Sequence, residues 1–181
     1  MENFKSEYTN SILNVAEQIF GDYEVTYHEV ISEKKLQQLL YLANRQCLAE
    51  FGYALFVDTM IGQPDSPFSP EVAAAYTNNG IQGADFSSHD PNSISKQVWD
   101  NPACGNTMVY SGAVVDYYGE QTEEELDAVI QADQSWQNSR KGLFPQQEGN
   151  KILLLSDIQK DAAHIPAEFC FAKEWGSEEW Q

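Results

Sequence analysis

The fold is decided by residues 32–52, which have the sequence SEKKLQQLLYLANRQCLAEFG. Apolar side chains recur along this stretch, at Leu36, Leu39, Leu40, Ala43, Cys47, Leu48 and Phe51. Steps of three and four residues place such side chains on one face of an α-helix. Ser32 is of a type that caps helix N-termini, and Gly52 is of a type that ends helices. The stretch therefore predicts a long amphipathic helix whose apolar stripe forms the core.

Three further helices are expected beside it. Residues 12–20 carry apolar side chains at helical spacing, and Gly21 predicts the end of that helix. Residues 108–118 are almost entirely apolar and predict a buried helix. Thr122 and Glu125 match a capping box, in which hydroxyl and carboxylate each bond a free amide at a helix start. The sequence thus predicts helices on both sides of residues 32–52.

The chain between these helices contains turns. Residues 53–61 suggest an extended segment, and residues 63–68, QPDSPF, predict turns because proline disfavours the helical region for its predecessor. Ser69 and Pro70 suit the N-cap and the first position of a short helix. That helix is expected to end near residues 78–80.

The remaining segments complete the predicted architecture. Residues 80–106 show little periodicity and are interpreted as an inserted loop. Residues 152–155 suit a strand, Ser156 could cap a last helix, and the tail over residues 166–181 is aromatic and acidic. The length of 181 residues is within the range of one domain. We predict a mainly α fold, a compact single-domain helical bundle over residues 1–181 with a short extended or hairpin element and a long inserted loop.

Composition limits the partners. The chain has 28 acidic and 10 basic residues and a net charge of -18, which repels nucleic acid and anionic lipid and speeds encounter with basic proteins. Acidity that serves solubility alone is the alternative. Three isolated cysteines favour a reducing compartment, and neither a signal peptide nor a membrane span is evident. We expect a cytoplasmic protein with a basic protein partner, and without direct nucleic-acid or membrane binding.

The sequence lacks a pattern typical of catalysis. The three histidines lie in separate segments without metal-ligand spacing, and no phosphate-binding, dinucleotide, nucleophile-elbow or zinc-protease motif occurs. Cys47 lies on an apolar helical face, where cysteine usually acts as a small hydrophobe. We expect no enzyme, no metal and no cofactor. An unrecognised carboxylate pair is the alternative, and a deep pocket with strongly perturbed acids would indicate it.

Negative charge concentrates in the middle of the chain. Between Gln46 and Ser139, fourteen acidic residues accompany one lysine, a net charge of -13. The densest part supplies the candidate partner-binding carboxylates, which are Asp116, Glu120, Glu123, Glu124, Glu125, Asp127 and Asp133. At about 1.5 Å per helical residue their mean spacing is about 4 Å, against about 3.4 Å for phosphates of one DNA strand. A solvated helix face is the alternative. Such charge disfavours self-association through this face and leaves a homodimer through another open.

Residues 35–43, KLQQLLYLA, resemble the opening helix of the SocA-like, or Panacea, antitoxin domain family, which includes phage-associated GepA-like proteins. Residues 52–56 and 67–72 are similar to the glycine-PLF segment and the helix start that follow it in the family. Residues 114–119 and 126–142 resemble two later blocks. The family's Trp-x-Tyr-Gly turn is replaced by residues 63–66, and its His-x-Glu by residues 132–134.

The resemblance implies a helical domain that neutralises a toxin by direct binding and carries out no reaction. It also implies partner contacts near the proline turn, at Pro67, Ser69 and Glu71. The alternative is a phage-encoded acidic inhibitor of a bacterial nucleic-acid-binding defence effector, an anti-CRISPR-like protein that could act as a DNA mimic.

Overall fold

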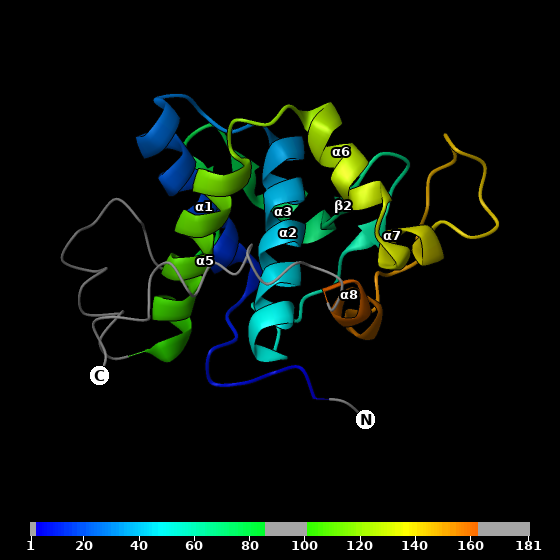
Figure 1. The fold of residues 1–181 in the computed structure, drawn as a ribbon. Helices are drawn as coiled ribbons and strands as arrows, with labels where there is room; N and C mark the ends of the chain where they lie inside the picture. Colours follow the sequence, from blue (N-terminus) through cyan, green and yellow to red (C-terminus); the bar gives the residue numbers. More distant parts are fainter. Residues whose placement is uncertain (1–2, 86–100, 163–181) are drawn as a thin grey trace.

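Helix α2 (Glu33–Phe51) runs through the centre of the molecule (Figure 1). The computed structural model describes residues 3–85 and 101–162. Ser32 caps α2 by accepting a hydrogen bond from the Lys35 N–H, and Gly52 ends it with a φ of 75°. The predicted helix and both of its ends are confirmed. However, residues 36–48 are buried without a break, so neighbours surround α2 on every side instead of covering one stripe.

Helices α1 (Ile12–Tyr27) and α5 (Pro102–Tyr118) pack against each other and against one side of α2 (Figure 1). The predicted end at Gly21 is wrong, because α1 continues until His28 takes a φ of 57°. One helical glycine costs only about 1 kcal/mol, and the burial of Tyr23 beyond it offsets that cost. Helix α5 starts at Pro102, well before residue 108, because Asn101 caps it.

The predicted insertion over residues 80–106 is therefore not a loop at either end. A short strand occupies its first residues, and α5 covers its last ones. The middle of this prediction, residues 86–100, and the whole predicted tail, residues 166–181, lie outside the described residues.

Two short hairpins flank helix α3 (Pro70–Ala75). In the first, β1 (Ile61–Gly62) pairs antiparallel with β2 (Pro67–Phe68), and the turn between them contains Pro64. Ser69 caps α3 as predicted, through the Val72 N–H. Helix α3 ends before the predicted position, because β3 (Tyr76–Thr77) and β4 (Gly80–Ile81) form the second hairpin there.

Three helices complete the other side of α2, namely α6 (Glu123–Gln131), α7 (Gln134–Ser139) and α8 (Leu155–Ala162) (Figure 1). The strand predicted over residues 152–155 is reduced to one bridge between Ile152 and Ile61. Helix α8 already begins at Leu155, so Ser156 lies inside it and the prediction of Ser156 as a cap is wrong.

One hydrophobic core joins the helices. Its buried side chains come from α1, α2, α3, α5, α6 and α8, with the fully buried Tyr41 and Tyr110 among the largest. The mainly α fold predicted from the sequence is confirmed. Within residues 3–85 and 101–162, no helix combines the length and the apolar character needed to cross a membrane.

Candidate partner-binding surface

Two consecutive glutamines join α2 to two different elements. Gln37 Nε2 donates to the Ser69 carbonyl at 3.1 Å, and Gln37 Oε1 accepts from the Ser69 N–H at 2.9 Å. Gln38 Nε2 donates to the Glu123 carbonyl at 2.8 Å and to the Asp127 carboxylate at 2.7 Å. Successive helical residues point about 100° apart, so one amide reaches α3 and the next reaches α6. The KLQQ segment thus positions α3 and α6, two of the elements that carry predicted site residues.

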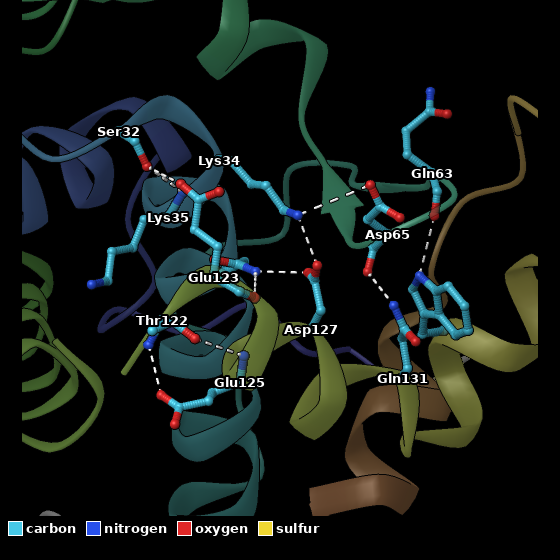
Figure 2. A network of polar contacts seen from close by, with 12 residues as sticks. Ser32, Lys34, Lys35, Gln63, Asp65, Thr122, Glu123, Glu125, Asp127 and Gln131 are labelled. Carbon is cyan, nitrogen blue, oxygen red and sulfur yellow. Dashed lines mark hydrogen bonds and ion pairs between the residues drawn. The ribbon is translucent and has the colours of Figure 1, made fainter. Parts of the chain in front are cut away.

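Lys34 forms the centre of a polar network between α2, α6 and the first hairpin (Figure 2). Its Nζ lies 2.7 Å from Asp127 Oδ2 and 4.0 Å from Asp65 Oδ2. Burial alone would lower the pKa of Lys34, but the hydrogen bond and charge of Asp127, with the charges of Asp65 and Glu123, raise it overall. Three carboxylates therefore act on one ammonium group.

Lys35 points in another direction and ties down the end of α5. Its Nζ donates to the Gly119 carbonyl at 2.6 Å, where the negative end of the helix dipole favours a cation. Burial lowers the pKa of Lys35, against the opposing charges of Glu29, Glu123 and Glu125. Lys35 is thus another amine within the same acidic surroundings.

The start of α6 uses two of its three consecutive glutamates internally (Figure 2). Thr122 Oγ1 accepts from the Glu125 N–H at 3.2 Å, and Glu125 Oε2 accepts from the Thr122 N–H at 2.8 Å, which confirms the capping box. Glu123 Oε1 accepts from the Ser32 hydroxyl at 2.5 Å. Glu124 is exposed. Only Glu124 of the three therefore presents its carboxylate without a hydrogen bond among the described residues.

Asp133 is an internal ion-pair partner. Its Oδ2 accepts from Arg45 Nη1 at 2.8 Å and from the Tyr41 hydroxyl at 2.7 Å, and 13% of its side chain is exposed. Burial alone would lower the pKa of Arg45, and the Asp133 charge raises it overall. Asp133 therefore fastens the α6–α7 junction to α2.

The ten predicted partner-binding residues fall into two groups. Six are buried or used internally, and these are Pro67, Ser69, Glu123, Glu125, Asp127 and Asp133. Four are exposed with no hydrogen bond or ion pair to another described residue, and these are Glu71, Asp116, Glu120 and Glu124. Residues 116–133 thus present fewer carboxylates to a partner than their sequence contains.

The exposed carboxylates at the end of α5 act on their neighbours in α1. Burial, with a smaller contribution from Asp116, raises the pKa of Asp22 to about 6, although a hydrogen bond from Gln18 opposes the rise. Burial also raises the pKa of Tyr27, as do the charges of Glu120 and Asp116. These shifts indicate a negative potential where α5 meets α1.

The carboxylates do not form one straight row. Helix α5 ends at Tyr118 and α6 begins at Glu123 on the other side of α2 (Figure 1). Asp116 and Glu120 therefore belong to one part of the surface and Glu124 to another. This arrangement differs from the regular spacing of phosphates along a nucleic-acid strand.

Two grooves lie near the first hairpin. One, of about 240 Å³, is formed between β1–β2 and the first turns of α2. The other, of about 290 Å³, is mainly apolar and lies between residues 56–60 and residues 152–156. The perturbed Asp22 lines neither groove. Burial raises the pKa of Cys47 to about 12, which keeps this thiol protonated.

Among the described residues, no group of three or more histidine, cysteine, aspartate or glutamate side chains is placed to hold a metal ion. The hydrogen-bonding groups instead join helices to one another.

Comparison of the chain with protein-family models, with curated proteins and with solved structures gives no match. The resemblance of residues 35–43 to the antitoxin domain remains a prediction. The geometry adds a physical role for that segment, since Lys35, Gln37 and Gln38 connect α2 to three other parts of the fold, namely the end of α5, the start of α3 and α6.

Proposed function

We propose that this protein is an antitoxin-type binding module that neutralises a basic partner protein by direct contact. The observation that carries the proposal is the set of exposed carboxylates Asp116, Glu120 and Glu124, which form no ion pair with a described residue. A partner with complementary lysine or arginine side chains would find these charges unoccupied. The SocA-like resemblance supports the same class of function.

Rigid support around these carboxylates favours binding. Lys35 holds the end of α5 beside Asp116 and Glu120, and the capping box orders the first turn of α6 beside Glu124. Surfaces that are ordered before binding lose less conformational entropy when a partner docks. The internal contacts of the neighbouring acids therefore contribute to recognition indirectly.

Co-expression with the product of the neighbouring gene tests the proposal. We expect the neighbour to inhibit growth when expressed alone, and the two proteins to co-purify and restore growth when expressed together. The combined variant Asp116→Asn, Glu120→Gln, Glu124→Gln should associate more slowly and show a weaker salt dependence. A neighbour that is harmless alone and forms no complex would contradict the proposal.

A second candidate is an anti-CRISPR-like inhibitor of a nucleic-acid-binding defence effector. The net charge of -18 favours it, because carboxylates could occupy a basic groove that otherwise holds phosphates. Competition with DNA for the effector distinguishes this candidate from an antitoxin. Simultaneous binding of DNA and this protein to one effector would rule out mimicry.

A further inference from the structure

The groove between the first hairpin and α2 has acidic and apolar parts side by side. Its lining includes Glu33 and Lys34 from the first turn of α2, together with Asp65, Pro67 and Phe68 from the hairpin. The volume is about 240 Å³, which is the scale of one side chain and its surrounding water, not of a large ligand. The groove thus suits a single protruding side chain.

Charge in and around the groove leaves room for a second cation. Among the described residues of the lining, Lys34 is the one cation, and its ammonium already lies 2.7 Å from the adjoining Asp127. Asp65 lies farther from that ammonium, at 4.0 Å, and 62% of its side chain is exposed. Glu33 accepts a weak hydrogen bond from Gln37 at 3.3 Å. Two lining carboxylates are therefore available to an incoming positive group.

The apolar part favours arginine over lysine. Pro64, Pro67 and Phe68 line the groove beside these carboxylates. A guanidinium group is planar and weakly hydrated, stacks on aromatic faces and binds carboxylates with two parallel hydrogen bonds. A lysine ammonium is strongly hydrated and cannot stack in this way. An arginine side chain can pair with the carboxylates and stack on the apolar rings at the same time.

Hydrogen bonds from α6 and α7 hold the backbone of the hairpin turn that lines the groove (Figure 2). Gln131 Nε2 donates to the Asp65 carbonyl at 2.9 Å, and Trp136 Nε1 donates to the Gln63 carbonyl at 3.3 Å. Gln37 holds the backbone of Ser69 just after β2. Because the walls are fixed before binding, little reorganisation would oppose docking.

An arginine in this groove must come from another molecule of different sequence. The chain contains two arginines, Arg45 and Arg140, and both are buried. Arg45 pairs with Asp133, while Arg140 donates to the carbonyls of Gly62 and Gln147 at 3.1 and 2.6 Å. Neither can reach a second copy without unfolding. Self-association therefore cannot fill the groove with arginine.

We infer that this groove receives an arginine side chain of a basic partner protein, between the Asp65 and Glu33 carboxylates and the ring of Phe68. The inference rests on the proposed function, because it names the chemical group of the partner that the chain would recognise. It assigns the hairpin a role different from that of Asp116, Glu120 and Glu124, which would attract the partner from a distance.

Titration of the full chain with N-acetyl-arginine amide, followed by two-dimensional NMR, tests the inference. We expect saturable shifts at the backbone amides of Gln63, Ser66 and Phe68, and much smaller shifts with the neutral analogue N-acetyl-citrulline amide. Asp65→Asn should weaken the arginine compound about three- to fivefold, as for loss of one exposed ion pair. Glu7→Gln, which removes the same charge at an exposed position outside the groove, should leave its affinity unchanged.

Several outcomes would overturn the inference. These are equal shifts from arginine and citrulline, tighter binding of N-acetyl-lysine amide, or an affinity that Asp65→Asn does not change. Asp65 is exposed, so the variant should unfold at the same urea concentration as the parent chain, which excludes a folding defect. Because no partner protein is used, failure here would leave the proposed function standing. If co-purification fails instead, the affinity for the arginine compound can still be measured, so the two failures are distinguishable.

Discussion

At the scale of single residues, the polar side chains within the buried stretch of α2 carry much of the structural information. Gln37, Gln38, Asn44 and Arg45 are each at most 6% exposed, and each bonds a different part of the fold. A buried amide without a partner is costly, so these residues select the neighbours that can satisfy them. The leucines of α2 alone would not distinguish one apolar neighbour from another in this way.

Replacement of Gln37 by methionine should destabilise the protein. The substitution keeps the volume but leaves the buried Ser69 N–H without its acceptor, at a cost of about 1–3 kcal/mol. Urea unfolding followed by circular dichroism measures the loss. Gln82→Met serves as the control, because Gln82 is exposed and should change stability little. Equal stability of the two variants would mean that the Ser69 contact contributes nothing.

Asp22 should make stability depend on pH. Burial raises its pKa in the folded protein to about 6 from 3.8, so the folded state binds this proton more tightly than the unfolded chain does. The resulting contribution is complete below about pH 4 and is lost as the pH rises through about 6. Asp22→Asn should therefore be more stable than the parent at pH 7, by up to about 3 kcal/mol, and similar to it at pH 4. Urea unfolding at both values checks this, with the exposed Glu124→Gln as control.

At the scale of secondary-structure elements, α7 depends on a cap from outside itself. Asp133 occupies the N-cap position but makes no side-chain cap bond, because its carboxylate is committed to Arg45. Asp161 of α8 replaces it, with one oxygen 2.8 Å from the Gln134 N–H and the other 2.8 Å from the Ser135 N–H. Helices α7 and α8 are thus linked by one carboxylate.

Asp161→Ala should loosen α7 selectively. Two amides at the start of α7 would lose their acceptor, with a loss of about 1–2 kcal/mol. Hydrogen exchange should become faster at Gln134 and Ser135 than at amides in the middle of α2. Asp161→Asn keeps one oxygen acceptor and should lie between the parent and the alanine variant. Unchanged exchange at both amides would exclude capping by Asp161.

Local sequence was sufficient to predict those helix ends that adjacent residues determine. Helix α2, the cap of α3 and the capping box of α6 each follow from a few adjacent residues, and each was predicted. The end of α1 was not, because apolar contacts beyond Gly21 outweigh the cost of a glycine. The start of α5 could have been predicted from the Asn101–Pro102 pair, which suits an N-cap and a first helical position.

The candidate surface was harder to predict than the helices. Sequence alone identified an acidic segment, but it could not show that Glu123 and Asp127 are bonded internally while Glu124 is not. This difference depends on Ser32 and Lys34, which lie about 90 residues away in the chain. Whether a charge is free is therefore a tertiary property. The groove at the hairpin had no local signal other than its prolines.

At the scale of the whole molecule, the net charge of -18 should make stability increase with salt. Carboxylates that repel one another in the compact state are screened as the Debye length falls from about 30 Å in 0.01 M salt to about 10 Å in 0.1 M. Thermal unfolding should shift upward by about 2–4 °C for each kcal/mol of relieved repulsion. The combined variant Glu120→Gln, Glu124→Gln should shift less. A melting temperature that falls with added NaCl would contradict this prediction.

The long reach of the contacts at the start of α2 has a consequence for synthesis on the ribosome. Ser32, Lys34 and Gln38 find partners that lie 91, 93 and 89 residues later in the chain. At about 5–20 residues per second, α2 would wait roughly 5–20 s for α6 to be made. During that interval its leucine-rich surface lacks its final cover and is open to chaperones. The rate at which this protein is translated, not only its final stability, should then influence how much of it reaches the native state.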